Sequence, residues 1–251
     1  MIIMVTGATA GFGESITRRF IANGHKVIAT GRREERLKTL KDELGDNLYI
    51  AQLDVRNRAA IETLIADLPA EWQAIDVLVN NAGIDTQPSA PPEVSGPFEN
   101  FPEEIFREVV DVNLVGTFLA CQAVGARMVK AGKGGSIINV GSIYGMLSPI
   151  QDIYAYKKEM TGVPFIKPVA YSAAKSGIYN LTRYLATYWG KQGIRVNTLT
   201  PAGVWRDTQD EIFQANFCAR MPMGRMSQEN EYNGALIFLA SQASSFMTGS
   251  N

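Results

Sequence analysis

Two residues in the second half of the chain, Tyr171 and Lys175, have the types and spacing needed for proton transfer. A phenol exchanges a proton with an alcohol or carbonyl oxygen near neutral pH only if its pKa falls by roughly 3 units from about 10, which costs about 4 kcal/mol. Residues four apart lie on one face of a helix, so the Lys175 ammonium can supply much of that stabilisation. The pair therefore predicts a proton donor and acceptor.

A second Tyr-x-x-x-Lys pair, Tyr154 and Lys158, competes with the first. Tyr154 follows the strand-terminal Ser142 by 12 residues, whereas Tyr171 follows it by 29. However, Tyr154 stands in a short segment bounded by proline and glycine, while Tyr171 opens a long helical pattern. The apolar positions of that pattern are Ala174, Ile178, Leu181, Leu185 and Tyr188. The helix pattern favours Tyr171, and it makes 146–168 an insertion over the substrate site.

A glycine-rich turn follows the first apolar run and reads Val5-Thr6-Gly7-Ala8-Thr9-Ala10-Gly11-Phe12-Gly13. Gly7 permits a tight turn, Gly11 lets the backbone approach a pyrophosphate, and Gly13 lets the next helix pack closely. We expect Thr9 and Phe12 to line the same cradle. The spacing predicts a dinucleotide-phosphate site at a helix N-terminus.

The second apolar run ends in two arginines, Arg32 and Arg33, with no carboxylate beside them. Sites for NAD usually place an acidic residue here, which hydrogen-bonds the ribose 2′-hydroxyl. Two guanidinium groups can instead bind a 2′-phosphate through charge-assisted hydrogen bonds. The sequence therefore predicts NADP(H) as the cofactor. The alternative is that both arginines only begin a solvated helix, as Arg-Arg-Glu-Glu-Arg suggests.

The elements that must position these residues alternate between short apolar runs and amphipathic segments. The predicted strands are 2–6, 26–30, 48–52, 77–80, 136–140 and 195–200, and the first predicted helices are 12–23, 34–44 and 58–68. This alternation predicts one α/β domain, a Rossmann-like doubly wound parallel sheet. Two proline-rich segments, 85–101 (including Pro88) and 146–168, interrupt it. We expect both as long loops beside the carboxyl ends of the strands, where ligands bind.

Composition narrows the class of protein. The chain has 251 residues, is 46% hydrophobic, and carries 24 Lys and Arg against 25 Asp and Glu, which disfavours nucleic-acid or anionic-membrane partners. No apolar run approaches the roughly 18 residues of a membrane span, and no secretion signal is evident. Two distant cysteines and one histidine, His25, predict no disulfide framework, no metal site and no His-dependent nucleophile. We expect a cytoplasmic protein that acts on a small molecule.

Five motifs in chain order make the sequence resemble the short-chain dehydrogenase/reductase (SDR) family. They are the glycine turn, Asn80-Asn81-Ala82-Gly83, Val112-Asn113-Leu114, Ser142 after a strand, and Tyr171 with Lys175. The resemblance implies hydride transfer between a nicotinamide cofactor and a secondary alcohol or carbonyl. It also implies that Ser142 hydrogen-bonds the substrate oxygen and that Asn113 helps to fix Lys175, commonly through water.

The same resemblance implies the remaining cofactor contacts. Asp54 and Val55, with Asn81, Ala82 and Gly83, would line the adenine and its ribose. Pro201, Gly203 and Val204 would hold the nicotinamide carboxamide, although Ala202 stands where most members have glycine.

The resemblance differs between two parts of the chain. Residues 1 to about 84 resemble NADP-dependent 3-hydroxy acid dehydrogenases that also reduce malonic semialdehyde. From Asp85 onward, Ser142-Ile143-Tyr144-Gly145 and Lys167-Pro168-Val169-Ala170-Tyr171 resemble SDRs found with bacterial surface-sugar (nonulosonate, flagellin-glycan) biosynthesis. The change near 84–86 suggests a chimera, natural or engineered, in which hydroxy-acid specificity is not inherited.

SDRs normally continue past a Thr-Gly such as Thr248-Gly249 into a seventh strand, whereas this chain stops at Asn251. We therefore expect six strands, no seventh, and an open sheet edge along 195–200.

Two functions remain in competition. The first is an NADP(H)-dependent oxidoreductase; the alternative is a catalytically silent or incomplete chimeric nucleotide-binding protein. The absent strand and Ala202 favour the alternative, whereas the intact Asn113, Ser142, Tyr171 and Lys175 disfavour it. Broad apolar faces on 114–129 and 171–189 indicate a homodimer or homotetramer, as the family resemblance implies.

Overall fold

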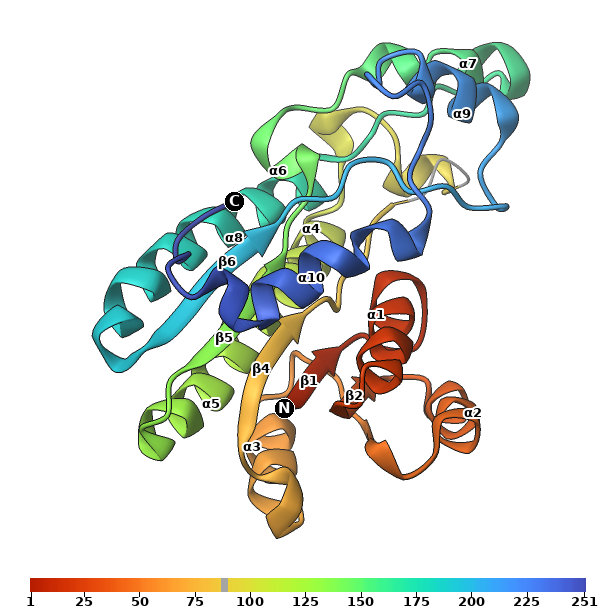
Figure 1. Ribbon diagram of the computed structural model, residues 1–251. Coiled ribbons are helices and arrows are strands. Elements are labelled where there is room, and N and C mark those ends of the chain that lie inside the picture. Colours follow the sequence, from red (N-terminus) through yellow and green to blue (C-terminus); the bar gives the residue numbers. More distant parts are fainter. Residues whose placement is uncertain (87–89) are drawn as a thin grey trace.

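A computed structural model describes residues 1–86 and 90–251; Pro88 lies outside the described residues. Within them, six strands form one sheet in the order β3-β2-β1-β4-β5-β6, with every pairing parallel (Figure 1). The strands are β1 (Ile2–Thr6), β2 (Lys26–Gly31), β3 (Leu48–Gln52), β4 (Ile75–Asn80), β5 (Gly135–Val140) and β6 (Ile194–Leu199). The doubly wound α/β fold is confirmed, and each predicted strand begins and ends within two residues of its observed bounds.

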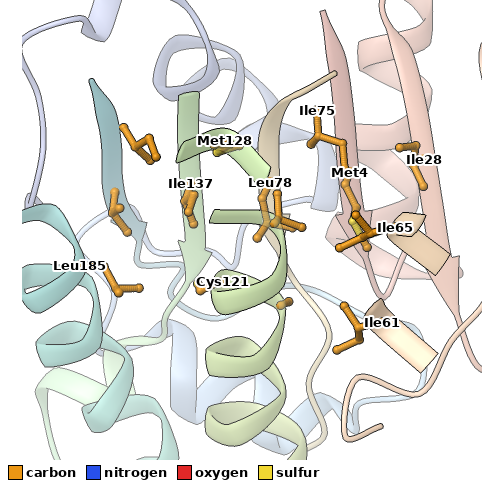
Figure 2. Packing of buried hydrophobic residues seen from close by; sticks show 14 of the residues in the cluster. Met4, Ile28, Ile61, Ile65, Ile75, Leu78, Cys121, Met128, Ile137 and Leu185 are labelled. Atoms are coloured by element: carbon orange, nitrogen blue, oxygen red, sulfur yellow. The ribbon is translucent and has the colours of Figure 1, made fainter. Parts of the chain in front are cut away.

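Helices cover both faces of the sheet because successive strand side chains point to opposite faces. One face packs against α1 (Gly11–Ala22), α2 (Glu34–Leu44) and α10 (Asn233–Ala240). The other packs against α3 (Arg58–Asp67), α5 (Gly116–Ala131) and α8 (Val169–Trp189). Figure 2 shows this second core, where Met4, Leu78 and Ile137 of the sheet meet Ile65, Cys121 and Leu185 of the helices.

A helical stretch before β5 corrects one expectation. Helix α4 (Glu103–Val110), a π-helical turn (Asp111–Val115) and α5 run together from Glu103 to Ala131. By length and composition this stretch is apolar enough to cross a membrane, so the prediction that no such run exists was wrong. Half of its most apolar 18 residues are buried inside the fold. Its apolar side chains include Ala120, Val124 and Met128 of the core. The high hydropathy therefore follows from packing against the sheet.

A smaller apolar cluster lies beyond the sheet. The segment 146–168, with α7 (Tyr156–Thr161), packs beside α9 (Glu211–Cys218), and together we call them the cap (Figure 1). The buried residues of the apolar cluster are Ile153, Tyr154, Tyr156, Phe165, Phe213, Phe217 and Met226, of which Met226 lies outside the cap. The Tyr156 hydroxyl donates to Asp210 at 2.6 Å, and Lys157 pairs with the same carboxylate at 2.9 Å. The short helix α6 (Ile143–Met146) leads from β5 into the cap.

The outer edge of β6 is not open, so that expectation was wrong. The last residues run beside β6: Gly249 N–H donates to Val196 O at 2.7 Å, and Thr198 N–H donates to Ser250 O at 2.9 Å. The Asn197 side chain adds a bond to Met247 O at 2.8 Å and accepts one from Ser250 N at 3.1 Å. The last residues thus satisfy backbone groups along the outer edge of β6.

Candidate active site

A cavity of about 640 Å³ opens at the carboxyl ends of the strands. It brings together most of the predicted site residues: Gly7, Thr9, Gly11, Phe12, Arg32, Arg33, Asp54, Val55, Asn81, Ala82, Gly83, Ser142, Tyr171, Lys175, Pro201, Gly203 and Val204. Gly13 and Asn113 do not line it and act from behind its wall. One continuous cavity therefore joins the glycine turn to the Tyr171 pair.

The glycine turn is built for close backbone packing. Gly7 adopts φ +68°, and a Cβ there would lie 2.7 Å from Ala82 Cα. A Cβ at Gly13 would lie 2.2 Å from Gly7 O, so only glycine lets α1 start against the turn. Asn81 holds the turn from β4, since its Nδ2 donates to Gly7 O at 3.0 Å. The N-terminal amides of α1 can thus face a phosphate, and the turn fits a dinucleotide.

Both arginines after β2 border this cavity. The Arg33 guanidinium donates to Thr9 Oγ1 at 2.9 Å and to Thr9 O at 3.1 Å, which ties the end of β2 to the glycine turn. Arg32 is exposed, and its carbonyl accepts a bond from Gln52 at 3.0 Å. Arg33 therefore does more than begin a solvated helix, and two cationic residues line the cavity beside the glycine turn.

The Asp54 carboxylate is already engaged. Arg56 Nη2 donates to it at 2.7 Å, and this hydrogen bond, opposed by burial, holds the pKa of Asp54 below its ordinary value. Val55 packs over the start of α5, where a Cβ on Gly116 would lie 2.6 Å from Val55 Cγ2. These residues form the wall of the cavity at the end of β3.

Tyr171 and Lys175 share the first turns of α8. Lys175 Nζ lies 5.7 Å from the centroid of the Tyr171 ring and donates to Val140 O at 2.6 Å. Burial lowers the pKa of Lys175 to about 8, while nearby Asp85 opposes that shift. Burial also raises the pKa of Tyr171, with Asp85 adding to the rise and a hydrogen bond with Ser142 opposing it. The expected lowering of the Tyr171 pKa is therefore not produced by the chain alone.

Ser142 and Asn113 are fixed by bonds that the sequence did not suggest. Ser142 Oγ accepts from Tyr144 N at 3.2 Å, and the Tyr179 hydroxyl donates to Ser142 O at 2.7 Å. Asn113, in the π-helical turn, is fully buried and bonds both backbone groups of Ile84, at 2.9 and 2.8 Å. Asn113 therefore holds the segment after β4, and Gly83 packs between its side chain and Lys175 Nζ.

Tyr154, the competing tyrosine, also lines the cavity, but its neighbours there are aromatic side chains. Its ring stacks on Phe213 at 5.6 Å, and its hydroxyl lies 3.4 Å from that of Tyr144. Helix α7 begins only at Tyr156, so Tyr154 and the exposed Lys158 do not share a helix face. Burial raises the pKa of Tyr154, which leaves its phenol neutral.

Several cavity residues escaped the sequence reasoning: Asp85, Tyr144, Lys167, Arg206, Phe213 and Phe217. Asp85 follows Asn-Asn-Ala-Gly closely, and Lys167 stands one helical turn before Tyr171, so position could have indicated both. The two phenylalanines lie on α9, far away in sequence, and no local signal places them here. Tyr179, two turns after Tyr171, could have been found by helical spacing.

A family model described as short chain dehydrogenase matches residues 1–217. The chain belongs to this family. Membership of the SDR family accounts for the fold and for the order of the five motifs. In the part of the chain that the structure describes, no group of three or more His, Cys, Asp or Glu residues could hold a metal ion.

Relatives of this SDR differ in how much they share with it. The NADP-dependent 3-hydroxy acid dehydrogenase YdfG of Escherichia coli K12 is 58% identical over 147 residues, which is 58% of this chain and 55% of that relative. The match thus spans about half the length of that relative. D-threitol dehydrogenase of Mycolicibacterium smegmatis is 30% identical over 100% of this chain and 89% of its own. A solved serine dehydrogenase, in a closed form complexed with NADP+, has a TM-score of 0.80 and 37% identity, covering 100% of this chain and 93% of that one.

Proposed function

We propose that this SDR is an NADP(H)-dependent oxidoreductase that interconverts a secondary alcohol and a carbonyl. One observation carries the proposal: a single cavity has the glycine turn at one end and Tyr171, Lys175 and Ser142 at the other. A bound nicotinamide supplies or accepts the hydride. The chain's own residues then need only bind the cofactor and move one proton.

In this proposal Tyr171 exchanges the proton with the substrate oxygen and Ser142 donates a hydrogen bond to that oxygen. Lys175 supplies positive charge within 5.7 Å of the Tyr171 ring. Because burial keeps the free phenol neutral, its ionisation depends on further positive charge from the oxidised cofactor. Asn113 holds Ile84, and with it the cavity wall beside Lys175.

The cofactor preference rests on Arg32 and Arg33 and is supported by relatives named for NADP. We expect Arg32→Ala/Arg33→Ala to weaken NADPH binding about 10–100-fold, as loss of charge-assisted bonds to a phosphate would. NADH binding should weaken far less, because it loses only the support of the Arg33–Thr9 bonds. Titration of cofactor fluorescence measures both. Arg36→Ala, on the exposed face of α2, is the control. Equal affinity for NADH and NADPH in the unaltered protein would exclude the preference.

The substrate class we propose is a polar, hydroxyl-bearing alcohol or carbonyl, as in the sugar-like substrates of the surface-sugar branch. The polar cavity groups near Tyr171 support it: Asp85, Tyr144, Tyr154 and Lys167. A relative that matches the whole chain is named for D-threitol. Turnover on a panel of keto sugars, tetruloses and 3-oxo acids tests the choice, and a preference for the 3-oxo acids would contradict it.

We further propose a single cytoplasmic domain over residues 1–251, assembled as a homodimer or homotetramer, with a seam near 84–86. The 58% match to the 3-hydroxy acid dehydrogenase covers 147 residues, so it extends past residue 86, and the proposal of a seam rests on the sequence motifs alone. The catalytically silent alternative is not favoured, because Ser142, Tyr171 and Lys175 line one cavity and Asn113 packs against Gly83 behind its wall. NADPH binding without turnover on any substrate of the panel would restore that alternative.

A further inference from the structure

A partly buried ion pair borders the cavity beside Tyr171. Lys167 Nζ donates to both carboxylate oxygens of Asp85 at 2.7 Å and to Thr86 O at 2.8 Å, which uses all three ammonium hydrogens. The Lys167 side chain is only 5% exposed and that of Asp85 28%. Such a lysine is not a free cation for binding a substrate anion, since its donors already have partners.

The lysine is held in place from its backbone as well. The Gln151 amide accepts from Lys167 N at 2.9 Å and donates to Lys167 O at 3.2 Å. The preceding residue, Ile166, donates to Ser95 O at 2.7 Å. The loop after β4 therefore binds the ammonium group through Asp85 and Thr86, while Gln151 and Ser95 hold the backbone at Lys167 and Ile166. Two bonds to one residue's backbone leave little freedom for it to move aside.

Both members of the pair line the same cavity as Tyr171. Lys167 Nζ lies 5.6 Å from the centroid of the Tyr171 ring, as close as Lys175 Nζ at 5.7 Å. The Asp85 carboxylate bonded to Lys167 carries the opposite charge and also borders the cavity. A charge within about 4–6 Å of a titrating group shifts its ionisation, and the sign depends on the sign of the charge.

We propose that Asp85 and Lys167 are positioning residues whose opposite charges cancel beside Tyr171 and so set the pH range in which its phenol gives up a proton. This inference rests on the proposed function. Without Lys167 the carboxylate would stand alone and oppose phenolate formation. Without Asp85 the ammonium would stand alone and favour it.

Other polar and charged groups face Tyr171 or the same part of the cavity, and the pair acts in addition to them. They are Ser142 and Tyr144 after β5, Tyr154 of the cap, Lys175 and Tyr179 of α8, and Arg206 after β6. None of them bonds to Lys167 Nζ among the contacts of the described chain, so the two substitutions below leave their bonds in place and alter only the pair and its bonds to the Thr86 backbone.

The experiment titrates Tyr171 in the full chain saturated with NADP+. Phenolate absorbance is recorded with and without Tyr171→Phe, and the difference isolates Tyr171. We expect Lys167→Met to move its midpoint up by about one pH unit and Asp85→Asn to move it down by about one. The double variant should return to within about half a unit of the unaltered protein. Lys158→Met, which removes an exposed lysine of the cap, should leave the midpoint unchanged.

A pair that only holds the fold would give a different result. Both single variants would then shift the midpoint in the same direction, or neither would shift it, and either outcome overturns the proposal. NADPH binding and thermal unfolding establish that each variant is folded. If Lys167→Met does not fold, the downward shift of the Tyr171 midpoint in Asp85→Asn tests the proposal by itself. The titration needs no substrate, so an absence of turnover would count against the proposed function without deciding this one.

Discussion

At the scale of single residues, Tyr171 and Tyr154 have the same side chain and line the same cavity, but only one has lysine ammonium groups close to its ring. We expect Tyr171→Phe to lower kcat about 10²–10⁴-fold, as loss of a general acid or base does. Tyr154→Phe removes only a 3.4 Å contact with Tyr144 and should change kcat by less than about fivefold.

Steady-state kinetics on the best substrate of the panel measures both tyrosine variants. Thermal unfolding is the control for folding, since both rings are packed in the cavity wall. Loss of turnover in Tyr154→Phe alone would reverse the assignment.

We expect Lys175 to make the affinity for the cofactor depend on pH. Because burial lowers its pKa to about 8, from an ordinary value near 10.5, its positive charge is present below that pH and is lost above it. We expect NADPH affinity to fall about fivefold between pH 7 and 9, as the attraction of roughly 1 kcal/mol from one charge disappears. Lys175→Met should bind weakly at both pH values. Fluorescence titration measures this, and a parallel fall in both proteins would contradict the assignment.

At the scale of elements, Asp210 joins α7 to α9 in two ways. Its carboxylate accepts from Phe213 N at 2.8 Å as the N-cap of α9, and it binds Tyr156 and Lys157 of α7. Burial would raise the pKa of Asp210, but these bonds outweigh burial and lower it. Its contribution to stability is therefore present above its unfolded pKa and is lost as the pH falls below it.

We expect Asp210→Ala to lower the free energy of unfolding by about 1–2 kcal/mol, since both the cap and the link to α7 are lost. Asp210→Asn keeps a capping oxygen and should cost about half as much. Hydrogen exchange separates the two roles: Asp210→Asn should speed exchange in α7 alone, and Asp210→Ala in both helices. Unchanged exchange in α7 for both variants would show that the cap is held by its apolar cluster alone.

At the scale of the whole molecule, α5 and α8 cover one face of the sheet but leave large apolar side chains outside. Phe118 is 43% exposed, Tyr184 62% and Tyr188 63%, and the two tyrosine rings stack on each other. Large apolar side chains exposed on one face are typical of interfaces, and most soluble homo-oligomers are symmetric. We therefore expect a dimer or tetramer that buries this face.

Tyr184→Glu/Tyr188→Glu should reduce the mass measured by light scattering to that of a monomer, because the substitution buries charge at the predicted interface. Met223→Glu alters an apolar residue after α9 that is 74% exposed, more than either tyrosine, and should leave the mass unchanged. An unaltered mass in the tyrosine variant would place the interface elsewhere or exclude it.

Much of the fold and part of the site followed from local patterns. The six strands, the turn at Gly7, the arginines after β2 and the Tyr171 pair all depend on residues close together in sequence, so periodicity and spacing predicted them. The observed bounds of several strands differ from the predicted bounds by one or two residues, because the ends of secondary-structure elements are weakly defined by local sequence. The membrane-span length of 103–131 was missed, because its apolar residues are spread over two helices and the turn between them.

By itself the sequence determined the six strands, the helices between the first four of them, the helix that Tyr171 opens and the cofactor-binding motifs, because helical and strand periods and glycine spacing act over a few residues. It did not indicate α7, which lies in the segment 146–168 expected as a loop. Only the tertiary structure decided the contacts between residues far apart in sequence. These are the tail that covers β6, the bonds of Asn113 to Ile84, and the ion pair between Asp85 and Lys167, 82 residues apart. Such contacts depend on how the cap and the loops pack over the sheet. Packing is set by shape and burial summed over the whole molecule, which no local pattern contains.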